Sequence, residues 1–302
     1  MSQLTIVEVG LRDGLQNESV HLSVEHRFQI LKVLMQSGLK RIEVGAFVRS
    51  DKVPQMAGTA ELLELAQKYK AENKKFKDVK FSVLIPNLKG WEEAESLKPD
   101  EVALFASSTE SFSQKNINCS IDESFERFEP VVARAKKKKI KIRGYLSVCF
   151  GCPFEGEVPE KQVLKLIDRM FKMKVDEVSV GDTIGIAHVG QIKSLFKKIK
   201  SKHPLKKVAG HFHDTRGQAL ANILAAYELG VKIFDSSVGG LGGCPYAPGS
   251  TGNVATEDVL FMMNGMSVKT GVQIQPLIGL NQQIGQWMSK SLPSKVSRAG
   301  VR

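Results

Sequence analysis

The sequence lacks the features of several protein classes. Its 302 residues include only four cysteines, at positions 119, 149, 152 and 244, too few and too dispersed for a disulfide framework. No uninterrupted apolar run approaches the roughly 20 residues of a membrane span. The N-terminus shows neither a signal peptide nor an Arg-rich leader. We therefore expect a soluble, cytoplasmic protein that does not bind membranes.

Patterns typical of nucleic-acid-binding modules are also missing, although the chain is basic. The formal net charge is +11, from 43 Lys and Arg against 32 Asp and Glu, a balance that favours acidic partners such as phosphate-bearing molecules. The densest run, Lys136–Lys139, has no interleaved aromatic residues and precedes the apolar Ile140. It predicts a solvated helix end, where lysines meet exposed carbonyl groups. We expect no nucleic-acid binding.

No Gly-x-Gly-x-x-Gly follows the first strand-like run, which argues against a dinucleotide-binding fold. Eight short apolar or β-branched runs are each followed by a helix-like stretch: Leu4–Val9, Arg41–Phe47, Val79–Ile85, Glu101–Ala106, Ile140–Val148, Glu177–Val180, Val208–His213 and Ile233–Val238. This alternation predicts an α/β fold, a (β/α)₈ TIM barrel with additional C-terminal helices. In the absence of a Pro/Ser-rich linker we predict one catalytic domain over residues 1–302, with the barrel over about 1–270 and terminal helices over about 271–302.

Polar residues gather where the predicted strands end, which is where TIM barrels carry their chemistry. Because side chains on a strand alternate, His211 and His213 face the same side while Phe212 faces away. Two such imidazoles could bind a divalent ion or could be structural, since His-x-His alone is a weak motif. With oxygen ligands from Asp13 and Asn253, the donor set suits Mg²⁺ or Mn²⁺.

Two further residues carry possible chemistry. Arg12 could be a surface ion-pair partner or the group that stabilises a developing oxyanion, held by the inward-facing Glu43. Cys244 lies in a Gly-rich loop over the predicted mouth, as either a small residue in a tight turn or a proton-transferring thiol. Cys149 and Cys152 form a Cys-x-x-Cys with no second pair, which argues against a zinc or redox role.

Together these segments resemble the 3-hydroxy-3-methylglutaryl-CoA (HMG-CoA) lyases. The resemblance spans nearly the whole chain and is most specific in the loop around Cys244. The matching stretches are Val7–Glu18, Val53–Met56, Lys115–Ser120, Gly151–Gly156, Gly181–Gly185, His211–Asn222 and Gly239–Asp258. Two departures, Ala46 and Arg216, stand where the family often has Ser and Tyr, and they leave the preferred acyl chain open.

The resemblance implies a metal site of Asp13, His211, His213 and Asn253 and a catalytic set of Arg12, Asp13, Glu43 and Cys244. It also implies substrate contacts from Arg12 and Gln16, an acyl-CoA thioester substrate and a homodimer. The implied reaction is the retro-Claisen cleavage of HMG-CoA to acetoacetate and acetyl-CoA, as in leucine degradation. The alternatives are a lyase for a longer branched 3-hydroxyglutaryl-CoA and a condensing enzyme of the isopropylmalate or citramalate synthase type.

Overall fold

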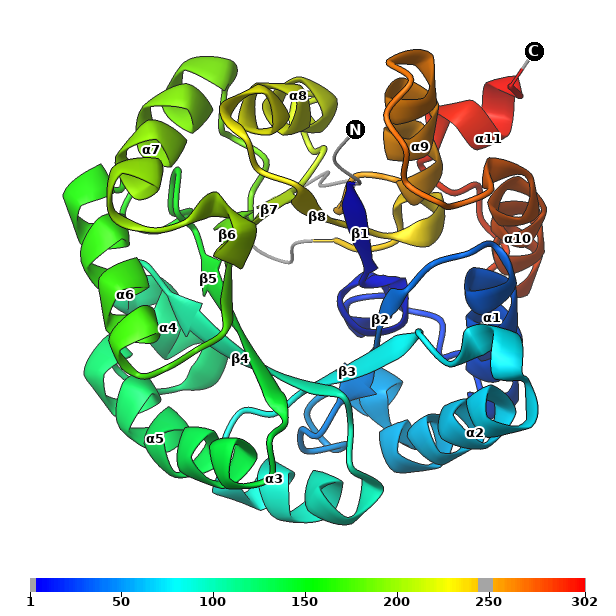
Figure 1. Cartoon of the computed structure of the whole chain (residues 1–302), viewed down its shortest axis with the longest axis horizontal. Coiled ribbons are helices and arrows are strands. Elements are labelled where there is room, and N and C mark those ends of the chain that lie inside the picture. The colour runs from blue at the N-terminus through cyan, green and yellow to red at the C-terminus, as the bar shows by residue number, and fades with distance from the viewer. Residues whose placement is uncertain (1–3, 244–251, 302) are drawn as a thin grey trace.

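Eight parallel strands close into a barrel in the computed structural model, which describes residues 4–243 and 252–301 (Figure 1). Each strand is hydrogen-bonded to the next, and β8 pairs with β1. The strands are β1 (Thr5–Glu8), β2 (Arg41–Ala46), β3 (Lys80–Leu84), β4 (Glu101–Ser107), β5 (Lys141–Ser147), β6 (Glu177–Asp182), β7 (Val208–Phe212) and β8 (Ile233–Ser236). The TIM-barrel prediction is confirmed, and every predicted run overlaps its strand.

Helices form the outer layer because nearly all of them bury one apolar stripe toward the barrel. On α6, for example, Val163, Leu166, Ile167 and Met170 are all buried. The helices are α1 (Val24–Gln36), α2 (Thr59–Glu72), α3 (Leu88–Ala94), α4 (Glu110–Ile117), α5 (Ile121–Lys137), α6 (Glu160–Lys172), α7 (Val189–Lys202), α8 (Ala219–Leu229), α9 (Thr256–Gly265), α10 (Ile274–Trp287) and α11 (Lys295–Ala299). No helix in the described ranges is long and apolar enough to cross a membrane.

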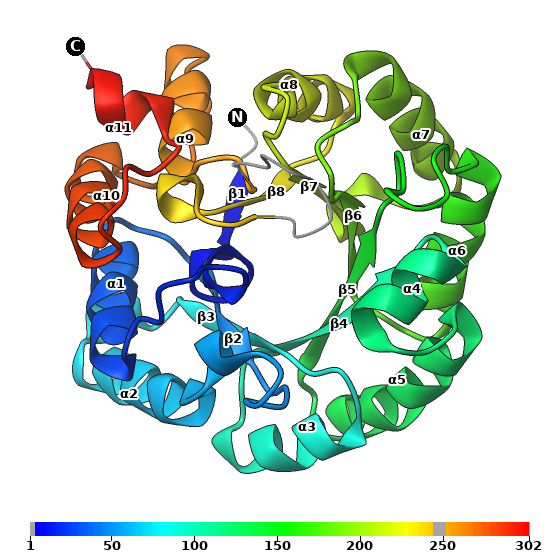
Figure 2. The same cartoon turned by 180° about the vertical axis from the view of Figure 1, so that it is seen from behind.

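The predicted C-terminal helices are α10 and α11, which follow the barrel's last helix, α9. Both views place α10 beside α1 (Figures 1 and 2). Trp287 of α10 stacks on His26 of α1 with 4.5 Å between ring centroids. The C-terminal segment therefore completes the helical layer where the two ends of the barrel sequence meet. The extent of the single domain stays a prediction.

The inside of the barrel is unusually polar for a fold whose interior is normally filled by layers of branched apolar residues. A chain of ion pairs runs along it from the end where the strands begin. Arg41 contacts both Glu101 and Glu177 at 2.9 Å. Glu177 also contacts Arg143 at 2.9 Å, and Arg143 reaches Asp235 at 2.6 Å. This chain ends at the residues described in the next subsection.

Figure 2 shows the opposite end, where the strands finish and where α4 follows β4 directly. At this end β1 leads into one turn of π-helix, Gly10–Gly14, while β7 ends beside residues 252–255. Those of the residues singled out in the sequence that the structure describes therefore meet at one mouth of the barrel.

Helix-to-barrel packing can be tested at Phe196. This side chain of α7 is fully buried against Phe212, whose ring points outward from β7. Replacing Phe196 by Ala should lower the free energy of unfolding by about 3–5 kcal/mol, because the cavity adds to the lost transfer energy. Urea denaturation measures this. Lys197→Ala, at the exposed neighbouring position, is the control and should change it by less than about 0.5 kcal/mol; equal effects would contradict this packing.

Candidate metal centre and active site

The π-helical turn Gly10–Gly14 presents Arg12 and Asp13 to the mouth. Glu8 anchors the turn: its carboxylate accepts hydrogen bonds from the backbone N–H groups of Gly10 and Val238 and from the hydroxyl of Thr256. Burial raises the pKa of Glu8 to about 7 against the opposing effect of these bonds. Glu8 thus ties the turn after β1 to the segments after β8.

Close approach between these segments also favours glycine at position 14. A Cβ atom there would lie 2.6 Å from the hydroxyl of Ser237, which is shorter than any real contact of this kind. The turn can therefore rest directly on the chain that leaves β8, and Asp13 is brought to the side of the mouth that carries the histidines.

Asp13, His211 and His213 form a group suited to a metal ion. One ligand atom from each lies within 4.8 Å of the others. Both histidine Nε2 atoms are 3.8 Å from Oδ2 of Asp13. The two imidazoles share a face as predicted, while Phe212 between them contacts Phe150, Phe196 and Phe234. A mixed set of two nitrogens and a carboxylate fits a divalent cation with room for substrate oxygens.

The buried ion-pair chain orients one of these histidines. Asp235 contacts Nδ1 of His211 at 3.1 Å and also accepts hydrogen bonds from Arg143 and Ser179. Although burial raises the pKa of Asp235, the charge of Arg143 holds it at about 2. The contact with Asp235 keeps Nε2 of His211 turned toward Asp13, in the manner of the carboxylate partners of metal-binding histidines.

Asn253, the fourth predicted ligand, lies next to this group. It forms an isolated antiparallel bridge with His213, and its side-chain Nδ2 donates to Oδ2 of Asp13 at 2.8 Å. An amide offers a donor on one side and an acceptor on the other. As a ligand Asn253 would use its Oδ1 after a half-turn of the amide group, so its ligand role stays a prediction.

Arg12 is buried at the mouth and held from three sides. Its Nε donates to Glu43 at 2.8 Å, its Nη1 donates to Asp13 at 2.6 Å, and its guanidinium lies over the ring of Tyr145. The structure thus contains the Arg12–Glu43 pair expected from the sequence. Burial raises the pKa of Glu43, opposed by the charge of Arg12. Among the described residues Nη2 of Arg12 has no hydrogen-bond partner, which leaves it available to a ligand.

A cavity of about 330 Å³ opens from these residues toward solvent. Its polar wall includes Arg12, Asp13, Gln16, His211 and His213, as the sequence predicted. Sequence reasoning missed another part of the wall, which is built by residues of β3, β4 and β5, by α4 and α5, and by the link between these two helices. Those residues include Leu84, Phe105, Phe112, Cys119, Phe128 and Tyr145. Ordinary apolar spacing hides them, because only the fold shows which apolar residues face the cavity.

Several other residues fall outside the cavity. Ala46 is buried away from its lining, and Arg216 donates to the carbonyl oxygens of Ile184 and Gly185. Cys149 and Cys152 are buried and unpaired by any disulfide, and their sulfur atoms contact Ser108 and Thr109. Cys244 lies outside the described residues, so its predicted proton-transfer role is not tested by this geometry.

Comparisons with known proteins agree on one family. A family model described as HMGL-like matches residues 3–284. A 3-hydroxy-3-isohexenylglutaryl-CoA/hydroxy-methylglutaryl-CoA lyase of Pseudomonas aeruginosa is 46% identical over 98% of this chain and 97% of its own. A hydroxymethylglutaryl-CoA lyase of Pseudomonas mevalonii is 45% identical over 100% of this chain and 97% of its own.

Solved structures show the same similarity in three dimensions. The crystal structure of hydroxymethylglutaryl-CoA lyase from Pseudomonas aeruginosa superposes with a TM-score of 0.92 at 46% identity, covering 98% of this chain and 97% of that one. An HMG-CoA lyase from Acinetobacter baumannii, solved with coenzyme A and 3-methylmalate, has a TM-score of 0.91 at 32% identity, covering 99% of this chain and 95% of that one.

The metal group predicts how binding responds to substitution. Loss of a supporting contact to a metal-bound histidine weakens metal binding by about 10- to 100-fold. Replacing His213 by Ala should weaken Mn²⁺ binding by more than this, because it removes a ligand. Titration calorimetry on EDTA-treated protein measures this. His203→Gln, at a histidine that contacts Asp168 on the surface instead, is the control and should bind Mn²⁺ like the unsubstituted chain. Unchanged binding by His213→Ala would remove this residue from the site.

Proposed function

The chain belongs to the HMGL-like family, and we infer that it is a carbon–carbon lyase that cleaves HMG-CoA to acetoacetate and acetyl-CoA. The observation that carries this inference is the cavity itself: Asp13, His211 and His213, a group suited to a metal ion, line it together with the buried, partly unpartnered Arg12, which contacts Asp13. The family members at 45–46% identity that span nearly the full chain are lyases of this kind.

The reaction breaks the bond between the carbon that bears the hydroxyl group and the α-carbon of the thioester. The hydroxyl proton passes to a base or to water, the electron pair of the broken bond becomes the thioester enolate, and a proton delivered to that carbon completes acetyl-CoA. The site must therefore accept one proton, stabilise one enolate and supply one proton.

We propose that Asp13, His211, His213 and Asn253 hold a divalent cation, Mg²⁺ or Mn²⁺. Such a cation lowers the pKa of a hydroxyl that binds it. Burial raises the pKa of Asp13, but the charge of Arg12 and contacts with the two histidines bring it well below its usual value. A carboxylate that stays ionised is a good metal ligand, and the proposal gives Asp13 this role.

Arg12 is suited to the enolate. Glu43 and Asp13 hold its Nε and Nη1, and Tyr145 supports its plane, so Nη2 is aimed without further loss of side-chain entropy. Tyr145 also donates to Glu43 at 3.1 Å, which fixes the carboxylate that fixes Arg12. We propose that Glu43 acts in this way, through Arg12.

Two residues complete the proposal. Gln16 lines the cavity one turn beyond Arg12, where its amide can contact the substrate. Cys244 is proposed as the proton donor to the enolate carbon. It follows Gly243, which lines the cavity, and this position in the chain supports the role.

A second candidate keeps this chemistry on a longer branched acyl chain. The wall formed by Phe105, Phe112 and Phe128 is apolar and could bury an alkenyl substituent. The relative from Pseudomonas aeruginosa bears the names of both substrates.

Three finer expectations remain proposals: a homodimer, a cytoplasmic location and a place in leucine degradation. Acetoacetate and acetyl-CoA as products support the last. Light scattering on the purified protein tests the first.

Metal dependence is tested with EDTA-treated protein. We expect no acetoacetate without added metal, and restored turnover with Mg²⁺ or Mn²⁺ in a coupled assay that reduces acetoacetate. The matched control adds the same metals to the His213→Ala variant, which should stay inactive. Absence of acetoacetate under every metal would refute the proposed reaction.

The role of Arg12 predicts a loss in kcat. Arg12→Gln should lower kcat by at least about 10³-fold, as does loss of an oxyanion-stabilising donor. Its Mn²⁺ content should remain intact at saturating Mn²⁺, because Arg12 supports Asp13 but is not itself a ligand. Arg169→Gln, at a surface position on α6, is the control. Turnover that survives in Arg12→Gln would disprove the enolate role.

Substrate length is tested by comparing the two thioesters. If the aromatic wall accepts the longer chain, Phe112→Ala should raise kcat/KM for the isohexenyl substrate relative to the methyl substrate by about tenfold, because a pocket methylene is worth about that much. Tyr227→Ala, on α8 and outside the cavity lining, is the control. An unchanged ratio would place the acyl chain elsewhere.

A further inference from the structure

The basic charge of the chain is concentrated at the end of the barrel where the strands begin. Parallel strands in a closed barrel bring every helix-to-strand connection to this one end. The connections before β3, β5, β6 and β7 are rich in lysine, as in Lys74–Lys80, Lys136–Lys141, Lys172–Lys174 and Lys202–Lys207. Over the rest of the sequence the two signs nearly balance. We call this end the basic face.

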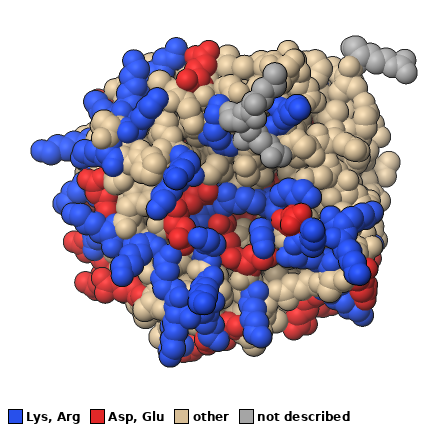
Figure 3. Space-filling model, in the orientation of Figure 1, with Lys and Arg blue, Asp and Glu red and all other residues tan. Residues whose placement is uncertain are grey.

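Figure 3 shows the basic face in the orientation of Figure 1. Lys and Arg side chains spread over its left, lower and right parts, whereas the upper right, near α9 and α11, carries few charges. The cations thus cover an area in two dimensions instead of following one helix or one groove.

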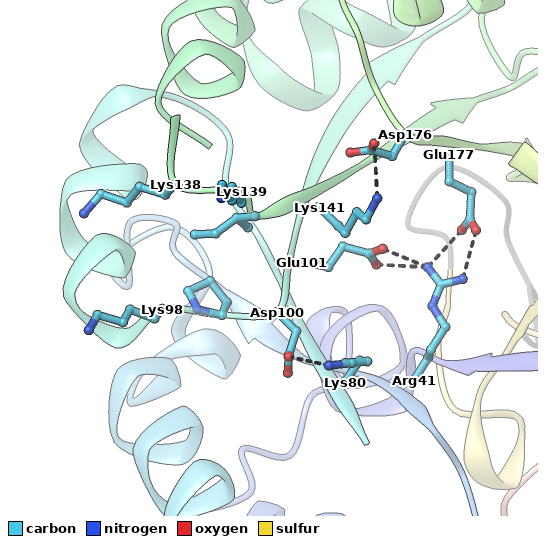
Figure 4. A pocket seen from close by; sticks show the side chains of 12 residues that line it. Arg41, Lys80, Lys98, Asp100, Glu101, Lys138, Lys139, Lys141, Asp176 and Glu177 are labelled. Carbon is cyan, nitrogen blue, oxygen red and sulfur yellow. Dashed lines mark hydrogen bonds and ion pairs between the residues drawn. The ribbon is translucent and has the colours of Figure 1, made fainter. Parts of the chain in front are cut away.

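A hollow of about 870 Å³ lies in the middle of this face (Figure 4). Its acidic side chains are already neutralised: Glu101 and Glu177 hold Arg41, Asp100 contacts Lys70 and Lys80, and Asp176 contacts Lys136 and Lys141. The acids of the hollow are thus used up by Arg41 and these four lysines, and Lys98 and Lys139, which also line the hollow, have no ion pair among the described residues.

Many of the surrounding lysines are exposed and form no ion pair within the described residues. Among the described residues, no ion pair involves Lys74, Lys75, Lys77, Lys98, Lys137, Lys139, Lys172, Lys174, Lys206 or Lys207. Two smaller lysine-lined hollows lie on the same face, one at Lys70, Lys74 and Lys77 and one at Lys136, Lys174 and Lys207. So many like charges at one end repel each other unless a polyanion faces them.

This charge is not placed to serve the active site. The mouth lies at the opposite end of the barrel and has cations of its own, Arg49, Lys52 and Arg127, that line the cavity and can meet the phosphates of a coenzyme. A partner on the basic face would leave the mouth open to solvent. The net charge of the sequence therefore points to a second partner, separate from the substrate.

We propose that the basic face docks this protein on an anionic lipid surface. A lipid surface is a plane of negative charge, and lysines spread over an area can all approach a plane at once. A nucleic-acid duplex is a line of charge and would reach only a strip of them. Lysine outnumbers arginine here, and lysine acts as a point charge without the paired geometry that arginine gives to phosphate recognition.

Two absences support the choice of a lipid surface held by charge alone. Among the described residues, the exposed large apolar side chains are Val20, Phe154, Ile186, Phe261 and Met266, and none of them lies in the lysine-rich connections. The face thus offers no exposed aromatic ring on which single-stranded bases could stack. The lysine-rich connections likewise have no apolar anchor to insert, so attachment through them would be peripheral and sensitive to salt. This inference revises the expectation of no membrane contact.

Vesicle co-sedimentation tests the proposal with the intact chain. The protein should sediment with vesicles of equal parts phosphatidylglycerol and phosphatidylcholine at low ionic strength. It should not sediment with vesicles of phosphatidylcholine alone, and about 0.5 M salt should release it. No sedimentation with the anionic vesicles would overturn the proposal.

A matched pair of variants tests the face itself. Lys77→Glu, Lys137→Glu and Lys207→Glu together reverse one exposed lysine on each of three connections, and should weaken binding to anionic vesicles by about tenfold or more. The control combines Lys89→Glu, Lys161→Glu and Lys165→Glu, the same charge change at exposed positions on α3 and α6 that carry no ion pair. Equal losses in the two variants would mean that net charge, and not this face, controls binding.

The lyase assay is run on both variants and should give the same turnover as the unsubstituted chain, since none of these residues lines the cavity. A short DNA duplex is added as competitor. If it displaces the protein from vesicles at equal phosphate concentration, the face prefers nucleic acid and the lipid assignment is wrong. If the protein stays on the vesicles, the assignment stands.

Discussion

The ion pair between Arg143 and Asp235 is the contact on which the organisation of this barrel depends. Both side chains are almost completely buried, and each has a second partner: Arg143 contacts Glu177, and Asp235 holds His211. Removing one member would leave a charge without a partner in a medium of low dielectric constant, a much larger penalty than the pair's net contribution to stability. The buried charges in the barrel therefore depend on one another. His211 at the mouth is held in place by a chain of ion pairs that begins at the opposite end of the barrel.

Tyr145 links the same buried arginine to the other side chains at the mouth. Tyr145 accepts a hydrogen bond from Arg143 and donates one to Glu43, which in turn holds Arg12. Arg143 thus supports both the group suited to a metal ion, through Asp235 and His211, and the proposed enolate-stabilising Arg12, through Tyr145 and Glu43. Positions two residues apart on a strand share a face, so Arg143 and Tyr145 of β5 can reach the two sides of the site together. This arrangement gives rigid placement without strain in the backbone of β5.

The two ends of the barrel have different electrostatic characters for the same topological reason. Strand ends supply the site and strand beginnings supply the basic face, so substitutions of the exposed lysines need not disturb the mouth, whereas substitutions that break the buried ion-pair chain would. The mouth brings together opposite charges in contact, whereas the basic face leaves like charges exposed. A single net charge for the chain conceals this separation, because it averages over ends that face different partners.

The sequence by itself determined the elements and several of the residues. The eight runs and their alternation with helices follow from short-range periodicity, so the barrel was predictable, as was the shared face of His211 and His213 on one strand. The pairing of Arg12 with Glu43 was predictable because a buried carboxylate needs a partner. Only the tertiary structure decided which distant residues support them. Asp235, Arg143, Tyr145 and the aromatic wall of the cavity carry no local signal, since their roles depend on the closure of the sheet. The existence of one basic face also depends on closure of the barrel, because a closed parallel barrel brings connections that are far apart in the sequence together at one end.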